Sequence, residues 1–224
     1  KIAKALEDKL HSWLSANNPS FDYKINPDDV GKRSLRSVVI FYLSKVDETP
    51  EELFKKLYED SNNMTDRYNA FSTIVSSDFS FSSEVQNHFF EKFRSQTLVV
   101  QKWISTLVQC DSDDVFERLE MIEKLPEFDI KVPNLVRSLV GRFAMGNLSQ
   151  FHREDGRGYI YVAEKISEVD EINPQIASRL ASSFNLYPKL CPSLKSQMKE
   201  ALNLLENKPK LSKNVAEILN KILK

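Results

Sequence analysis

The amino-acid sequence predicts an all-α protein in which antiparallel helix pairs form an α–α superhelix, a HEAT-like solenoid. Apolar residues recur at helical spacing along nearly the whole chain of 224 residues, and helix-start signals separate the periodic segments. The Phe79-Ser80-Phe81 stretch alternates but is too short to predict a strand. Because the connections are mostly short, successive helices should run antiparallel, and a long series of such pairs favours a solenoid over a closed four-helix bundle.

Six helices are expected in the first half of the chain, near residues 2–15, 27–45, 50–60, 64–77, 83–94 and 97–109. The second and third begin at Asn26-Pro27 and Thr49-Pro50, where a capping residue precedes a proline at the first helical position. Ser83-Glu84 is an acidic start for the fifth helix. Apolar faces support the first, second and sixth helices: Leu6, Leu10, Trp13 and Leu14; Leu35, Val38, Val39, Tyr42 and Leu43; and Val99, Val100, Trp103, Ile104 and Leu107.

Five more helices are expected near residues 112–124, 133–145, 157–171, 174–186 and 192–223, the last broken near Pro209. The acidic run at residues 111–114 begins the first of them, and Pro133 and Asn173-Pro174 begin two others. No break in composition divides the chain. We therefore expect one helical domain over residues 1–224.

Composition and charge exclude several classes of function. The net charge of −1 lacks the basic surface that nucleic-acid binding requires. No run of eighteen apolar residues occurs, so no membrane span is predicted. Cys110 and Cys191 are expected to be two buried thiols in a reducing compartment rather than a disulfide, which favours a cytoplasmic location. The chain begins with a charged amphipathic helix and lacks an initiator methionine, which suggests a fragment of something longer.

No catalytic or metal-binding motif is present in the sequence. A zinc peptidase needs the His-Glu-x-x-His pattern, but His11, His88 and His152 are far apart. Nucleophile elbows, Walker loops and dinucleotide fingerprints are also missing. We therefore predict no catalytic residue, no metal ligand and no cofactor in this chain.

A glycine-containing segment, Asp155-Gly156-Arg157-Gly158, precedes one of the expected helices. Its amides could form an anion-binding nest. The alternative is a tight turn whose glycines let two helices pack closely, and we favour this alternative.

Three polar residues on helices that begin at a proline are candidates for ligand binding. Arg137 and Arg179 each follow such a proline by four or five residues, and Gln175 lies one helical turn before Arg179. The alternative interpretation of both arginines is a structural ion pair or a solvated helix face.

Several sequence runs resemble one known family in the same order along nearly the whole chain. They are residues 30–36 (VGKRSLR), 63–71 (NMTDRYNAF), 98–103 (LVVQKW), 151–159 (FHREDGRGY) and 173–179 (NPQIASR). These runs are similar to motifs of the C-terminal helical domain of bacterial-type aminopeptidase N, the alanyl aminopeptidase branch of the zinc metallopeptidases. Two segments depart from the family pattern, at residues 132–135 and 186–192.

The resemblance implies a part of an enzyme that removes N-terminal amino acids from peptides. In the family, zinc and the catalytic residues belong to an upstream domain of the same polypeptide, which this chain does not contain. The helical domain covers the active site and forms a substrate cavity, and positions matching Arg137, Gln175 and Arg179 lie on its cavity side. The expected partners are thus a peptide substrate and the catalytic domain. The rival hypothesis is a free-standing helical scaffold that binds a protein partner.

Overall fold

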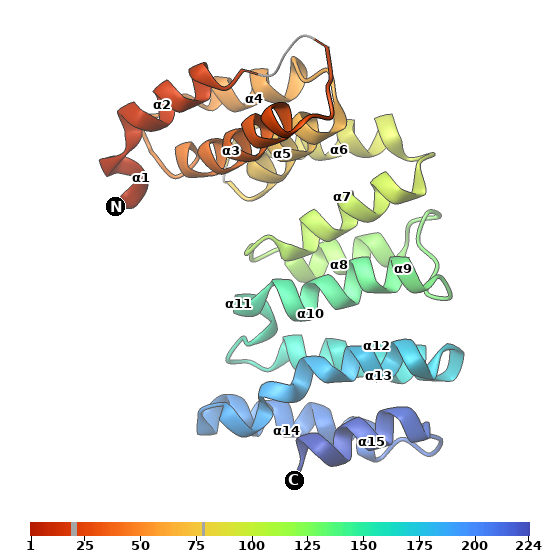
Figure 1. The fold of residues 1–224 in the computed structure, drawn as a ribbon. Helices are drawn as coiled ribbons and strands as arrows, with labels where there is room; N and C mark the ends of the chain where they lie inside the picture. Colours follow the sequence, from red (N-terminus) through yellow and green to blue (C-terminus); the bar gives the residue numbers. More distant parts are fainter. Residues whose placement is uncertain (19–21, 78) are drawn as a thin grey trace. The chain divides into compact units, whose positions relative to one another are not determined.

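The computed structural model describes residues 1–18, 22–77 and 79–224, and every regular element in these ranges is a helix. The predicted all-α class is therefore confirmed (Figure 1). The chain divides into two compact units, residues 1–92 and 93–224, which are described separately here. The single domain expected over residues 1–224 stays a prediction.

The described residues of the first unit form six helices, the last of which ends one residue beyond the unit's boundary. They are α1 (Ile2–Ala5), α2 (Glu7–Ala16), α3 (Pro27–Leu43), α4 (Glu51–Glu59), α5 (Met64–Val75) and α6 (Ser82–Phe93). Helix α3 packs against α2 and α5, and α4 packs against α5. The aromatic rings of Phe71 and Phe89 stack at 4.2 Å between centroids in the core of this unit.

The long helix α3 buries a different face from the one that its apolar residues suggest. Val39 and Leu43 are buried as expected, but Val38 remains 51% exposed. Arg33 and Arg36 are buried in its place, and the Arg36 guanidinium donates to the Leu14 carbonyl at 3.1 Å. Burial lowers the pKa of Arg36 because desolvation disfavours the charged form. The hydrogen bond from Arg36 to Leu14 thus holds α3 against the chain that precedes it.

The second unit is built from helix pairs that stack on one another. It contains α7 (Thr97–Gln109), α8 (Val115–Glu123), α9 (Pro133–Val136), the π-helical turn η1 (Arg137–Gly141), α10 (Arg142–Gly146), α11 (Leu148–Phe151), α12 (Arg157–Ile172), α13 (Pro174–Ala181), the 3₁₀ segment η2 (Ser182–Lys189), α14 (Pro192–Glu206) and α15 (Lys213–Ile222). Helix α7 packs against α8 and α10, α12 against α13 and α14, and α13 against α15. The two members of α12–α13 and of α14–α15 run antiparallel in Figure 1, as predicted.

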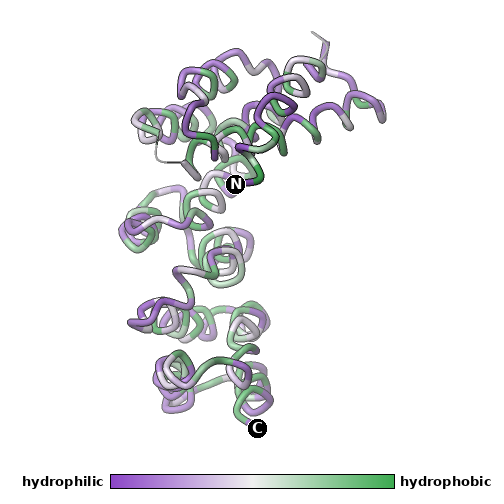
Figure 2. The backbone as a smooth tube through the Cα atoms, turned by 90° about the vertical axis from the view of Figure 1, so that its left-hand side faces the viewer, coloured by the Kyte–Doolittle hydropathy of each residue, from purple (hydrophilic) through white to green (hydrophobic). Residues whose placement is uncertain are grey.

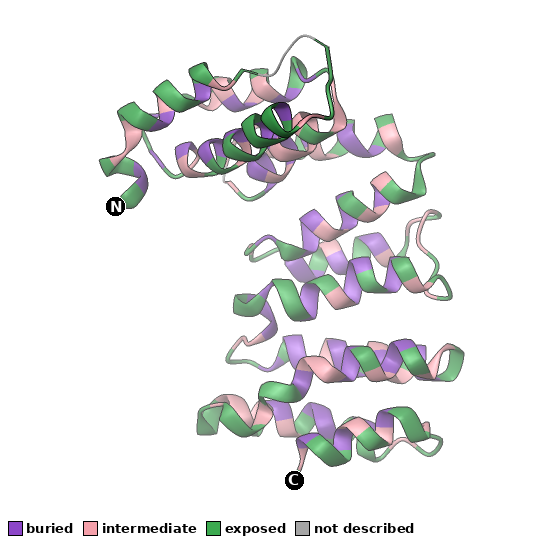
Figure 3. Ribbon diagram, viewed as in Figure 1, coloured by how far each residue is buried: buried purple, intermediate pink, exposed green. Residues whose placement is uncertain are grey.

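Amphipathic patterning explains how these helices pair. Along each helix, hydrophobic residues alternate with hydrophilic ones at helical spacing (Figure 2). The buried residues of the second unit lie where neighbouring helices face each other (Figure 3). Trp103, expected to be a core residue of α7, is 4% exposed, so that expectation is confirmed.

Most helix boundaries agree with the sequence analysis, and four departures stand out. Thr49 does not cap α4, because Pro50 is the residue that precedes the first helical position and the Thr49 hydroxyl has no hydrogen-bond partner. The helix expected at 2–15 is interrupted at Leu6. The one expected at 174–186 ends at Ala181, and its continuation is the 3₁₀ segment η2, which contains Pro188. The π turn η1 interrupts the helix expected at 133–145.

Candidate functional site

The second unit contains a pocket of about 420 Å³ that includes two of the three candidate binding residues. It is lined by Gln109, Arg137, Gly141, Arg142, Met145, Gly146, Ile176, Arg179 and Leu180. These residues come from the end of α7, from the η1–α10 segment and from α13. The structure thus brings Arg137 and Arg179 together, although 41 positions of the sequence lie between them.

Helix α13 supplies the apolar floor and one arginine of the pocket. The Asn173 side chain accepts a hydrogen bond from the Ile176 amide at 3.2 Å, so the predicted cap fixes the start of the helix. Ile176 and Leu180 are one turn apart and buried, whereas Arg179 is exposed. The floor is therefore apolar, and the charge lies at its edge.

The π turn places two more arginines on the opposite side of the pocket. The Arg142 amide donates to the Arg137 carbonyl, five residues earlier, so these two residues are neighbours across the turn. Gly141, between them, leaves room for α13: a Cβ atom there would lie 3.7 Å from the Leu180 side chain. Both Arg137 and Arg142 line the pocket as a result.

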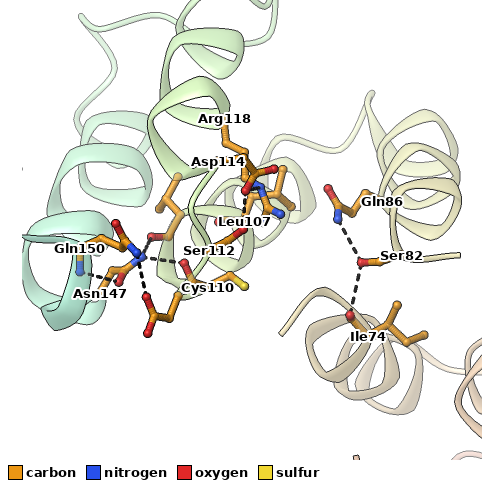
Figure 4. Close-up of polar contacts among 12 residues, drawn as sticks. Ile74, Ser82, Gln86, Leu107, Cys110, Ser112, Asp114, Arg118, Asn147 and Gln150 are labelled. Atoms are coloured by element: carbon orange, nitrogen blue, oxygen red, sulfur yellow. Dashed lines mark hydrogen bonds and ion pairs between the residues drawn. The ribbon is translucent and has the colours of Figure 1, made fainter. Parts of the chain in front are cut away.

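A close contact between the ends of α7 and α10 forms the third wall. A Cβ atom on Gly146 would lie 2.4 Å from the Gln109 amide nitrogen, so the glycine lets Gln109 lie over this end of α10. Asn147, next in the chain, is 2% exposed and donates to the carbonyls of Val108 and Cys110 at 3.0 and 2.7 Å (Figure 4). These bonds tie α10 to α7 and hold the wall in place.

The charge in the pocket is unbalanced. Three guanidinium groups line it, and its lining contains no Asp or Glu. Arg137 donates to the Asn134 side-chain oxygen at 2.6 Å, and none of the three arginines forms a salt bridge with any residue that the structure describes. Arginine carries a positive charge at neutral pH. The pocket therefore combines an apolar floor with an excess of hydrogen-bond donors that suit a carboxylate.

The third candidate, Gln175, is not part of this lining. It is exposed on α13, one turn before Arg179, and its backbone carbonyl accepts from the Ser178 hydroxyl at 3.1 Å. Its expected role in binding stays a prediction. The sequence analysis missed Gln109, Arg142 and Met145, whose place in the pocket depends on the π turn and on the α7–α10 contact.

The glycine-containing segment forms a tight turn. Gly156 has φ +71°, and the Asp155 carboxylate accepts from the Arg157 amide at 3.0 Å, which leaves that amide unavailable to an external anion. This hydrogen bond from the Arg157 amide holds the pKa of Asp155 below its usual value. A Cβ atom on Gly158 would lie 2.5 Å from the Phe151 carbonyl oxygen, so this glycine is needed for close packing. The geometry favours the tight-turn alternative over the anion nest.

Two polar side chains, partly buried His152 before this turn and buried Tyr159 after it, form a hydrogen-bonded pair. The Tyr159 hydroxyl and the His152 Nδ1 atom are 2.7 Å apart. Burial raises the pKa of Tyr159 to about 12 and lowers the pKa of His152. Both groups are therefore neutral at pH 7, and their hydrogen bond joins α12 to the end of α11.

The described residues include no group of three or more His, Cys, Asp or Glu side chains placed to hold a metal ion. Cys110 and Cys191 do not form a disulfide with each other. The expectation of two buried thiols is confirmed for Cys110 and wrong for Cys191, which is exposed. In the described part of the chain, no helix has the length and apolar character needed to cross a membrane.

The first unit holds a second pocket, of about 540 Å³, that contains none of the candidate residues. Its lining mixes basic Arg36 and Lys56 with acidic Asp60 and Asp66. These charges balance, so the lining favours no ligand of one sign.

Comparison with known proteins finds similarity to one part of larger aminopeptidases. A family model described as "Domain of unknown function (DUF3458_C) ARM repeats" matches residues 1–224. An Aminopeptidase N of Escherichia coli (strain K12) is 30% identical over 224 residues, which are 99% of this chain and 26% of that protein. An Aminopeptidase N of Haemophilus influenzae is 30% identical over 226 residues, covering 100% of this chain and 25% of its own length.

A solved structure shows the same fold. Legionella pneumophila aminopeptidase A, crystallised in complex with aspartic acid, matches with a TM-score of 0.87 and 27% identity over 99% of this chain and 27% of its own. The chain thus spans about a quarter of the length of these relatives. The family resemblance inferred from the sequence motifs is confirmed.

Proposed function

The chain belongs to the DUF3458_C family of ARM-repeat domains, and we propose that it is the C-terminal helical domain of a larger peptide-cleaving aminopeptidase. Its similarity to about a quarter of each Aminopeptidase N relative supports this proposal. In this proposal the zinc and the catalytic residues belong to another part of the same polypeptide. The helical domain covers the active site and lines the cavity that receives the substrate.

The observation that carries the proposal is the pocket that contains both Arg137 and Arg179. A peptide that enters the active site by its N-terminus leaves its C-terminal carboxylate and backbone carbonyls in the cavity beyond the scissile bond. Guanidinium groups bind a carboxylate with paired, charge-assisted hydrogen bonds. The buried floor at Ile176 and Leu180 can accept an apolar side chain of the same peptide. Gln175 is proposed as a backbone-binding amide nearby.

The test compares two substrates of the complete enzyme. Arg179→Ala should raise KM for a tripeptide about tenfold, a loss of about 1.4 kcal/mol, because the trailing carboxylate loses a partner. KM for an aminoacyl-arylamide should scarcely change, because that substrate has no trailing carboxylate. Lys189→Ala is the matched control, because Lys189 is an exposed cation outside the pocket lining. Equal losses on both substrates, or none on either, would contradict the assignment.

A second measurement tests whether zinc and catalytic activity belong to another domain of the complete enzyme. The complete enzyme should contain stoichiometric zinc, whereas this chain alone should contain none and hydrolyse no aminoacyl-arylamide. Zinc-dependent turnover by the chain alone would refute the proposal. A cytoplasmic location is part of the proposal and is supported by Cys110 and Cys191, which do not form a disulfide.

A further inference from the structure

The π turn changes which residues face the pocket. In a regular α-helix, two residues five positions apart point about 140° away from each other around the axis. Arg137 and Arg142 have this spacing, so a regular helix would turn Arg142 away from the pocket that Arg137 lines. In the structure, the hydrogen bond from the Arg142 amide to the Arg137 carbonyl is the five-residue bond of a π turn. This bond sets the two residues one above the other, and both line the pocket.

Arg142 gives the pocket more positive charge than a single carboxylate can neutralise. The C-terminal carboxylate of a peptide has two oxygens and can pair with one guanidinium in bidentate geometry, or bridge two. Three arginines surround this pocket, with no acidic residue in its lining. The third guanidinium therefore has no acidic partner in the lining when one carboxylate is bound. A second carboxylate on the ligand would supply that partner.

The floor of the pocket is apolar. Ile176 and Leu180 are buried, and Met145 is 54% exposed at the rim. This apolar surface suits the short aliphatic part of an acidic side chain better than it suits a polar group. The arrangement matches a C-terminal residue whose main-chain and side-chain carboxylates diverge from one short hydrocarbon stem.

We propose that Arg142 is a specificity-determining residue and that the pocket prefers peptides ending in Glu or Asp. The proposal rests on the function proposed above and names the substrate class for the same pocket. Arg137 and Arg179 hold the peptide's main-chain carboxylate, and Arg142 pairs with the side-chain carboxylate.

The first test uses tripeptides that differ only in their last residue. The complete enzyme should cleave Ala-Ala-Glu with a kcat/KM about fivefold or more above that of Ala-Ala-Gln, which is nearly isosteric but neutral. Arg142→Gln should abolish this preference by lowering kcat/KM for Ala-Ala-Glu to about that for Ala-Ala-Gln. Arg142→Lys should restore part of the preference, and Lys189→Gln should leave it unchanged. A wild-type enzyme without the preference, or a preference that survives Arg142→Gln, overturns the proposal.

The second test does not depend on peptide cleavage. N-acetyl-Ala-Glu has no free amine for an aminopeptidase to act on, and its binding to the complete protein can be measured by isothermal titration calorimetry. It should bind about fivefold or more tightly than N-acetyl-Ala-Gln, and only the wild type and Arg142→Lys should show the difference. Equal binding of the two peptides overturns the inference even if the enzyme is active. Selective binding by a protein that cleaves neither arylamides nor tripeptides supports the pocket assignment and refutes the proposed function alone.

Discussion

Gly158→Ala is the substitution whose effect on stability follows most directly from the structure. Gly158 lies in the first turn of α12, against the end of α11. An added Cβ atom would lie 2.5 Å from the Phe151 carbonyl oxygen, 2.6 Å from the Gln150 carbonyl oxygen and 2.8 Å from the Phe151 Cα atom. All three are backbone atoms, so no flexible side chain can move aside. To restore an ordinary contact of 3.4 Å, the two helices must separate by about 0.9 Å.

The magnitude follows from two opposing effects. Overpacking a well-packed interior typically costs 1–3 kcal/mol, and the rigid backbone contacts here place Gly158→Ala at about 3 kcal/mol. Alanine in a helix regains roughly 0.5–1 kcal/mol, because glycine loses more conformational freedom on folding. The net loss in the free energy of unfolding should be about 2 kcal/mol. For a chain of this size, it corresponds to a Tm lower by about 4–8 °C.

The assay is urea and thermal unfolding followed by circular dichroism at 222 nm, with Gly31→Ala as the matched control. Gly31 also lies in a helix, α3, but a Cβ atom there would meet nothing within 4 Å. The same change should therefore stabilise the protein at Gly31, by roughly 0.5–1 kcal/mol. If Gly158→Ala is as stable as wild type, the reasoning from close packing is wrong.

Three further predictions follow from individual buried groups. Asn147→Ala should lower the free energy of unfolding, measured by urea denaturation, by about 2–3 kcal/mol, because the carbonyls of Val108 and Cys110 lose their buried donor. A change below about 0.5 kcal/mol would contradict the claim that the Asn147 hydrogen bonds tie α10 to α7. Because burial lowers the pKa of His152, the unfolded chain binds the proton more readily. Stability should therefore fall as the pH falls below about 6.5, the unfolded value, and His152→Gln should weaken this dependence in unfolding curves measured from pH 7 to pH 5. In the native protein, a thiol reagent such as DTNB should modify the exposed Cys191 quickly and Cys110 slowly, since Cys110 is buried and burial raises its pKa; equal rates would show that the interior around Cys110 opens readily.

The sequence by itself determined the fold class, most helix boundaries and the family. These properties depend on local patterns: a cap such as Asn173 needs only the next three residues, and an apolar face such as that of α7 needs only its own periodicity. The glycine turn could also be predicted from the sequence, because the positive φ at Gly156 is a local backbone conformation that favours glycine. The two arginines could be chosen as candidates from their positions after helix-starting prolines.

Only the tertiary structure decided which side chains share the pocket. Gln109 reaches it because Gly146 leaves room for the Gln109 side chain over the end of α10, and neither segment alone predicts this contact. Arg142 reaches it because one turn of the helix is π rather than α, and five-residue spacing in a sequence predicts the opposite orientation. Helical periodicity assigns a residue to a face only while the helix stays regular. Where packing against neighbouring helices changes the local hydrogen bonding, the face is determined by the whole fold.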